Sequence, residues 1–152
     1  MSGFIPKIVV FCCNWGSHDG ADLADASRLK PNPHLRVIRT MCSGRVEPSF
    51  ILRAFTSGAD GVMIAGCHPG DCHYLSGNYK ARRLVGLLKK TLPQLGIEPE
   101  RLRLEWISTS EAPKFQSAVS EFIDKVTDLG PVNGTQGKRH NNRKQHTKVG
   151  LN

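Results

Sequence analysis

Continuous apolar runs rich in β-branched residues alternate along the chain with segments whose apolar residues recur at helical spacing. The runs predict strands, and those at 7–13 and 61–66 are almost continuously apolar, which is typical of strands buried on both faces. The predicted strands are 7–13, 35–41, 61–66 and 101–107, and the predicted helices are 19–29, 47–57, 78–95 and 110–129.

Residues that start and stop helices support these boundaries. Pro48 suits the first turn of the second helix, and Gly58 suits the position just after its end. Pro93 and Gly96 mark where the third helix ends. Ser110 is predicted to cap the last helix, with Glu111 in its first turn.

The alternation of strands and helices predicts an α/β fold in a single domain. Four β–α units in series favour a mostly parallel four-stranded sheet with right-handed connections and helices on both faces. The expected strand order is flavodoxin-like, 2-1-3-4. In such sheets, ligands bind beyond the carboxyl ends of the strands, where the first and third strands separate.

Length and composition set the class of protein. With 152 residues, 39% of them hydrophobic, the chain suits one compact domain, assigned to residues 1–130. No run approaches the roughly 18 apolar residues of a membrane span. The amino-terminal sequence has no features of a signal peptide, and the odd cysteine count favours a reducing, cytoplasmic setting.

The positive charge is concentrated at one end. Residues 131–152 carry five Lys or Arg and no acid, and removing those five from the net charge of +8 leaves +3 for residues 1–130. With almost no large apolar residue, this tail is predicted to be disordered. It either makes an electrostatic contact with an acidic partner or nucleic acid or has no specific role. Because it lacks aromatic residues for base stacking, nucleic-acid binding is not expected.

The five cysteines follow three of the predicted strands. Cys12 and Cys13 end the first strand, Cys42 follows the second, and Cys67 and Cys72 follow the third. Since the carboxyl ends of parallel strands meet at one edge, these thiols should converge on a metal, an iron–sulfur centre or a redox disulfide. Neighbouring strand residues point to opposite faces, so one of the first two is a ligand and the other a core or spare thiol.

The segment GCHPGDC can wrap a metal cluster closely, because its glycines let backbone N–H groups approach the sulfurs. Zinc usually takes C-x-x-C pairs, which are absent, so the spacing favours an iron–sulfur centre over zinc. Ligation by His68 and His73 is an alternative. Arg45 and Lys80 can offset negative charge or face an acidic partner, and Trp15 can shield the site from water.

Several segments together resemble the delta subunit of methyl-viologen-reducing hydrogenase over about residues 5–130. They are CCNWGSHDGADLADASRL, RTMCSGRVEP, GCHPGDCHYLSGNYKARR and LGIEPERLRLEWIS. The resemblance implies an electron carrier with a 2Fe-2S cluster, not a catalyst on its own. Its partners would be a nickel–iron hydrogenase or formate dehydrogenase and the flavin subunit of a heterodisulfide reductase, in anaerobic archaea and some bacteria. By position, the ligands would be Cys13, Cys42, Cys67 and Cys72.

One position departs from the family pattern. The family's first motif usually reads CNWC, whereas this chain has Gly16 in place of the second cysteine. If that position supplies a ligand, Cys12 would have to substitute, or the cluster would be altered or missing; if not, the four remaining cysteines suffice. Two other classes stay open: a dithiol protein cycling a Cys67–Cys72 disulfide, and a zinc-stabilised interaction module.

Overall fold

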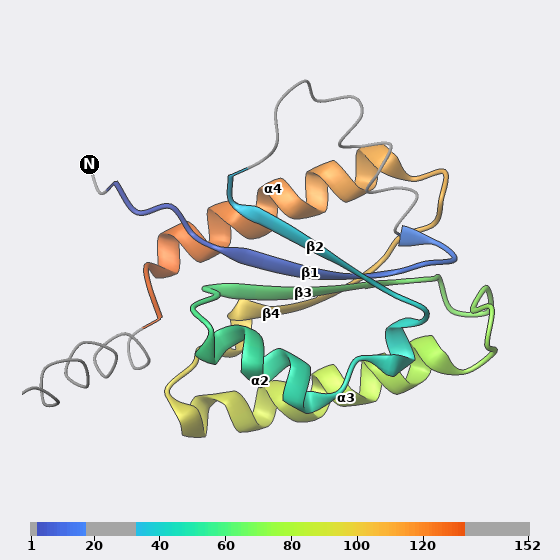
Figure 1. Ribbon diagram of the computed structural model, residues 1–152, viewed down its shortest axis with the longest axis horizontal. Coiled ribbons are helices and arrows are strands. Elements are labelled where there is room, and N and C mark those ends of the chain that lie inside the picture. Colours follow the sequence, from blue (N-terminus) through green and yellow to red (C-terminus); the bar gives the residue numbers. More distant parts are fainter. Residues whose placement is uncertain (1–2, 18–32, 133–152) are drawn as a thin grey trace, which may run out of the picture.

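The computed structural model describes residues 3–17 and 33–132, and within these ranges the strands form one parallel sheet. The strands are β1 (Ile8–Cys13), β2 (Leu35–Thr40), β3 (Gly61–Gly66) and β4 (Leu102–Trp106). Their order is β2-β1-β3-β4, so the predicted order 2-1-3-4 is confirmed (Figure 1). All three pairings are parallel, which places every carboxyl end at the same edge.

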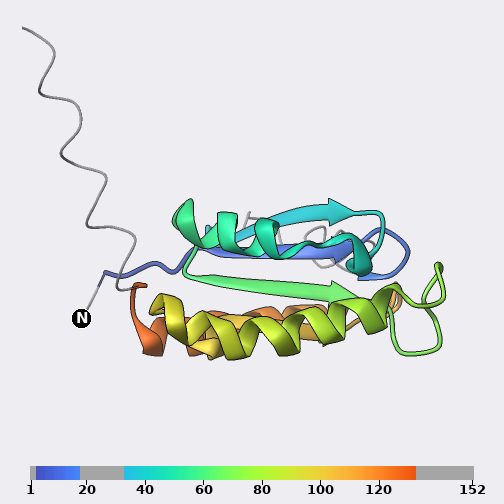
Figure 2. The ribbon, with the colours of Figure 1, turned by 90° about the horizontal axis from the view of Figure 1, so that it is seen from below.

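Helices cover both faces of this sheet, as predicted. They are α2 (Pro48–Thr56), α3 (Gly77–Thr91) and α4 (Ala112–Leu129). Helices α2 and α3 lie on one face and α4 on the other (Figures 1 and 2). The expected helix at 19–29 and nearly all of the expected tail at 131–152 lie outside the described residues. Among the described helices, none has both the length and the apolar character needed to cross a bilayer.

Alternation along the central strands builds two apolar layers. Phe11 and Ile64 face α2 and α3, whereas Val10 and Met63 face α4. All six residues of β3 are buried, which fits its continuous apolar run. The edge strand β2 is largely exposed, as its mixed sequence indicated.

Two helix boundaries differ from the prediction. Helix α4 begins at Ala112 with Glu111 as its N-cap residue, so the assignment of Ser110 as the cap is wrong. Pro113 explains the shift, because proline lacks an N–H and fits the first helical turn. Helix α3 ends at Thr91, and Leu92–Leu95 form a tighter 3-10 turn around a proline.

At the amino end of the sheet, a fully buried arginine joins three segments. Arg101 donates from Nε to Glu98 Oε2 at 2.6 Å, from Nη1 to the Asp60 carbonyl at 3.1 Å and from Nη2 to the Leu129 carbonyl at 3.3 Å. The Asp60 carboxylate in turn accepts from the backbone N–H of Lys7 at 2.9 Å. We call Arg101 with Asp60 the polar staple.

Replacing Arg101 by leucine should lower the free energy of unfolding by about 2–4 kcal/mol, because two buried carbonyl groups lose their donor. Urea denaturation followed by circular dichroism measures this loss. Arg82, which is exposed on α3, provides the control, and Arg82→Leu should change stability by less than about 0.5 kcal/mol. Equal unfolding midpoints for the two variants would contradict a stabilising role for the polar staple.

A candidate metal centre at the carboxyl edge of the sheet

Four buried thiols from three strand ends meet at the carboxyl edge of the sheet, and we call them the thiol cluster. Cys13 Sγ lies 3.5 Å from Cys67 Sγ, and Cys42 Sγ lies 3.9 Å from Cys72 Sγ. The two pairs also influence each other, since Cys13 helps to raise the pKa of Cys42 and Cys72 helps to raise that of Cys67. Cys13 and Cys67 are 54 positions apart in the sequence, and Cys42 and Cys72 are 30 positions apart. The fold thus brings together cysteines from distant segments.

The turn after β1 is fixed by a serine that sequence reasoning missed. Ser17 is fully buried, and its Oγ accepts from the backbone N–H of Cys13 at 2.8 Å and donates to the carbonyl of Ala65 at 2.7 Å. This hydroxyl thus holds the end of β1 against the end of β3. A single serine in a turn gives little signal in a sequence.

Two glycines make room for Cys42. The Cys42 side chain caps the 3-10 turn Ser43–Arg45, and its Sγ accepts from the Gly44 N–H at 3.4 Å. A Cβ added to Gly44 would lie 2.6 Å from the Cα of Gly77, and one added to Gly77 would overlap the Cys42 sulfur. Backbone and sulfur can approach this closely only because both positions lack a side chain.

An asparagine joins the loop after β3 to the first turn of α3. Asn78 is fully buried, and its Nδ2 donates to the carbonyls of Cys67 at 3.2 Å and His68 at 2.9 Å. This contact fixes the loop that carries two of the four thiols. A polar residue in the first turn of an otherwise apolar helix face was the available sequence signal.

Burial keeps two of the thiols protonated in the metal-free protein. It raises the pKa of Cys67 to about 12, and the hydrogen bond to Cys13 adds to this effect. Burial likewise raises the pKa of Cys42. A bound cation would reverse this preference, because thiolates are the metal-ligating form.

Cys72 differs from these two cysteines because backbone N–H groups surround it. Burial acts to raise its pKa, but the N–H groups of Asn78, Tyr74 and Gly77 outweigh burial and lower it. Two of these three N–H groups belong to the first turn of α3. The sequence placed such N–H groups within the loop GCHPGDC, whereas those that reach Cys72 come from Tyr74 and from the start of α3.

The spacing within each pair of thiols suits two ligands of one metal ion. Two thiolates on the same tetrahedral metal, at about 2.3 Å each, are separated by roughly 3.8 Å, close to both observed distances. Within the described part of the chain, no three His, Cys, Asp or Glu side chains are grouped to hold a single ion. The four thiols are thus described as two pairs, Cys13 with Cys67 and Cys42 with Cys72.

The alternative of a disulfide between Cys67 and Cys72 is not supported by these contacts. Each of these sulfurs contacts a cysteine from another strand end instead. All five cysteines are free thiols, and the sulfur separations far exceed the roughly 2.05 Å of a disulfide bond.

Cys12 and Gly16 occupy different environments. Cys12 is fully buried in the apolar layer beneath α4, together with Val10 and Met63, whereas Cys13 joins the thiol cluster. A Cβ added to Gly16 would lie 3.1 Å from Cys67 Sγ. A cysteine at position 16 would therefore sit beside the thiol cluster, whereas Cys12 packs into the core.

Both candidate histidines make other contacts. His68 Nε2 lies 2.6 Å from Glu111 Oε2, and this contact, helped by the Ser108 N–H, holds the pKa of Glu111 at about 2. His73 stacks on Trp15, with ring centroids 3.8 Å apart and planes at 10°. These contacts direct the two rings away from the ligand role that the alternative assigned to them.

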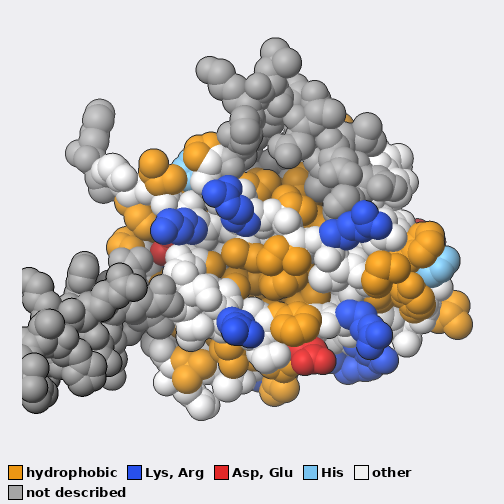
Figure 3. Space-filling model, in the orientation of Figure 1, with side chains coloured by type: hydrophobic (Ala, Val, Ile, Leu, Met, Phe, Trp, Pro, Cys, Tyr) orange, Lys and Arg blue, Asp and Glu red, His pale blue; other side chains and the backbone are white. Residues whose placement is uncertain are grey.

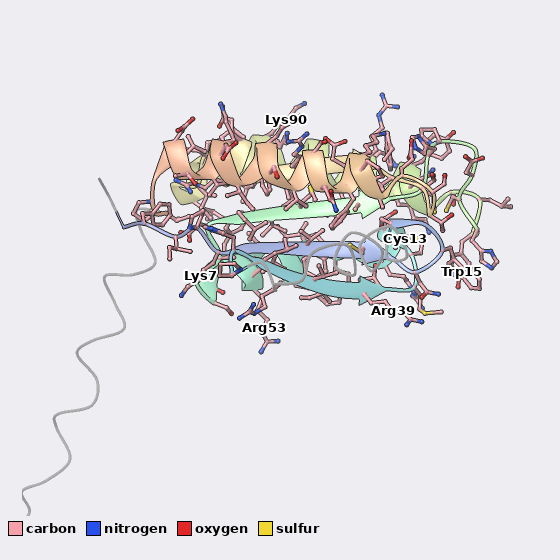
Figure 4. All side chains as sticks on the ribbon, turned by 90° about the horizontal axis from the view of Figure 1, so that it is seen from above. Lys7, Cys13, Trp15, Arg39, Arg53 and Lys90 are labelled. Carbon is pink, nitrogen blue, oxygen red and sulfur yellow. The ribbon has the colours of Figure 1, made fainter. Side chains whose placement is uncertain are left out.

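An exposed aromatic group borders the site. The stacked Trp15 also donates from Nε1 to Tyr74 Oη at 3.4 Å, and both side chains remain about half exposed. Figure 4 shows Trp15 and Cys13 at the same end of the sheet. These rings therefore lie at the edge of the site.

A pocket of about 400 Å³ opens beside Cys42. Its lining includes Arg45, Lys80 and Met41, and it contains no Asp or Glu among the described residues. One sulfur of the thiol cluster is therefore approached through a cationic opening.

The fold and site define a small parallel α/β protein that gathers paired thiols at its ligand-binding edge. A family model described as methyl-viologen-reducing hydrogenase, delta subunit, matches residues 8–130, and the chain belongs to this family. The resemblance inferred from the sequence is confirmed.

Individual relatives fall into two groups. The iron-sulfur subunit of the vhc F420-non-reducing hydrogenase of Methanococcus voltae is 59% identical over 126 residues, which are 83% of this chain and 88% of the relative. The iron-sulfur subunit of an F420-non-reducing hydrogenase of Archaeoglobus profundus is 55% identical over 126 residues, 83% of this chain and 92% of the relative. Both are single subunits of nearly the same extent.

The second group consists of longer proteins. One is a polypeptide of the ferredoxin/F(420)H(2)-dependent CoB-CoM heterodisulfide reductase of Methanosarcina acetivorans, which is 45% identical over 127 residues. These residues are 84% of this chain and 16% of that protein. A domain similar to this chain is thus part of a reductase polypeptide in that organism.

Proposed function

We propose that this protein is an electron-transfer subunit whose thiol cluster holds a 2Fe-2S cluster. The ligands are Cys13 and Cys67 for one iron and Cys42 and Cys72 for the other. The observation that carries the proposal is the pairing of four buried thiols at distances suited to one metal per pair. Membership of a hydrogenase subunit family supports the electron-transfer role.

When bound, a 2Fe-2S cluster supplies one-electron redox chemistry. The protein supports it by burial, which limits access of water, and by N–H groups directed at the sulfurs of Cys42 and Cys72. Such N–H groups stabilise the more negative reduced state and raise the reduction potential. Arg45 and Lys80 add positive charge on the open side of the site.

The proposed partners are a hydrogenase, as electron donor, and the flavin subunit of a heterodisulfide reductase, as acceptor. The names of the single-subunit relatives support the first, and the matched segment within the reductase polypeptide of Methanosarcina acetivorans supports the second. A formate dehydrogenase can replace the hydrogenase as donor in this proposal. A relay between two proteins needs the metal centre close to the surface, where the pocket beside Cys42 lies.

Anaerobic purification with iron, sulfide and zinc analysis tests the metal assignment. We expect about two iron and two sulfide per chain, with visible absorption that bleaches on reduction. A colourless, iron-free protein after reconstitution with iron and sulfide would reject the proposal. Stoichiometric zinc would indicate the interaction module, and a metal-free protein whose thiol count changes on reduction would indicate the dithiol protein.

Charge reversal at the pocket tests the approach of a redox partner. The double variant Arg45→Glu/Lys80→Glu should weaken association with the proposed partners by about tenfold or more at low salt, because opposite charges favour docking. The visible spectrum should stay unchanged, and added salt should reduce the difference. Lys125→Glu, on the exposed side of α4, is the control. Unchanged affinity in the double variant would remove these two residues from the docking surface.

A further inference from the structure

An apolar groove lies between the edge strand β2 and helix α2, on the face opposite α4, and its volume is about 490 Å³. Its floor includes Phe11, Ile38 and Phe50. The Phe11 and Phe50 rings stack with centroids 6.5 Å apart, yet Phe50 is 42% exposed and Ile38 is 44% exposed. Phe50 is thus packed against Phe11 on one side of its ring, while Phe50 and Ile38 both expose apolar surface to the groove.

Cations stand on both sides of this floor. Lys7, just before β1, and Arg36 in β2 line the groove on one side, and Arg53 lines it from α2. The described lining residues include no Asp or Glu, and none of the ion pairs in the described part of the chain involves these three cations. Figure 3, seen from the side that carries β2, shows apolar side chains gathered at the centre with Lys and Arg around them, and Figure 4 shows Lys7 and Arg53 projecting from that side.

We infer that this groove binds an amphipathic helix of a partner protein, in which carboxylates flank an apolar stripe on both sides. The inference rests on the proposed function only in taking the partner from the same electron-transfer complex. Charge complementarity argues for this occupant, because cations on both sides of an apolar floor match acids on both sides of an apolar stripe. The apolar contacts would supply affinity and the charges would fix orientation.

The charge pattern argues against the carboxyl-terminal segment of the same chain as the occupant. Residues 133–152 contain no Asp or Glu and carry five Lys or Arg, so they would meet the cationic rim with like charge. The groove residues also differ from those lining the pocket beside Cys42. The groove is therefore an anchoring surface separate from the opening through which a redox partner reaches the thiol cluster.

Photo-crosslinking in the assembled complex tests this inference. The full chain, with p-benzoylphenylalanine in place of Phe50, is assembled anaerobically with the hydrogenase and heterodisulfide reductase subunits of the same organism. The same crosslinker at Lys125, on the opposite face, is the matched control. We expect the Phe50 position to crosslink to one partner helix whose acidic residues flank an apolar stripe, and the control not to reach that helix.

A second variant measures the contribution of the charges. Arg36→Glu/Arg53→Glu should weaken association with the crosslinked protein by about tenfold or more at low salt, with iron content unchanged. A crosslink to this chain itself, to a second copy or to no protein would overturn the inference, as would release of a small anionic ligand from the groove. Unchanged affinity of the charge variant would overturn it as well.

The two proposals can fail separately. Iron and sulfide are measured on the isolated protein, where the groove plays no part. If the protein lacks iron but still gives the Phe50 crosslink, the metal assignment is rejected and the proposed helix-binding role of the groove is supported. A protein with a full cluster and no such crosslink rejects the groove and keeps the metal assignment.

Discussion

Replacing Cys67 or Cys72 by alanine is expected to reduce bound iron from about two atoms per chain to near zero and to abolish the visible spectrum. Each substitution removes one of the two thiols that would hold one iron of the proposed cluster, since Cys67 is paired with Cys13 and Cys72 with Cys42. Iron analysis and absorption spectroscopy of anaerobically reconstituted protein measure the effect. Alanine is preferred to serine, because a serine hydroxyl can act as a weak ligand.

Cys12→Ala is the matched control for these variants. Cys12 is a buried cysteine next to a proposed ligand, but its side chain packs in the apolar layer beneath α4. The Cys12→Ala variant should keep its full iron content, and its free energy of unfolding should fall by about 1 kcal/mol, the usual cost of a small core truncation. Loss of iron in this control would instead make Cys12 the substitute ligand that the absence of a cysteine at position 16 suggested.

Gly77→Ala is expected to disrupt the thiol cluster although it removes no ligand. The added Cβ would overlap the Cys42 sulfur and lie 3.3 Å from that of Cys72, so one pair of thiols must separate. Bound iron should fall severalfold, and stability should drop by about 1–3 kcal/mol from the overpacking. Iron analysis and thermal unfolding measure the two effects.

Gly86→Ala in the same helix distinguishes crowding from helix propensity. A Cβ added to Gly86 meets nothing within 4 Å. This variant should retain all iron and gain about 0.5–1 kcal/mol, because alanine favours a helix over glycine. Retention of iron by Gly77→Ala, with equal stability changes in both variants, would contradict the close packing around Cys42.

The sequence predicted the sheet because its periodicity follows burial directly. The unbroken apolar run of β3 matches a strand with all six residues buried, and the mixed run of β2 matches an exposed edge. Arg101 could not be placed in this way, because a charged residue that alternates with Leu102 and Leu104 is typical of an exposed face, whereas the structure buries it completely. Its burial depends on carbonyl acceptors 41 and 28 positions away, which no local pattern reveals.

For the site, the sequence predicted that the cysteines gather at the carboxyl edge of the sheet, but not which cysteine contacts which. Topology alone brings the ends of β1, β2 and β3 together, so convergence of the cysteines was predictable. Which sulfur contacts which depends on the loops after the strands, and Ser17 and Asn78 fix two of these loops through hydrogen bonds to carbonyl groups of other segments. The groove beside β2 was not predicted, because it arises where side chains of two separate elements fail to meet.

The polar staple and the thiol cluster lie at opposite ends of the sheet, and this separation bears on the order in which the molecule matures. The apolar layers and the buried guanidinium can close with no help from the sulfurs. The chain is thus expected to acquire its fold first and to receive iron afterwards, at a preformed edge. Cluster insertion would then be a late event that the cell can supply or withhold without rebuilding the protein.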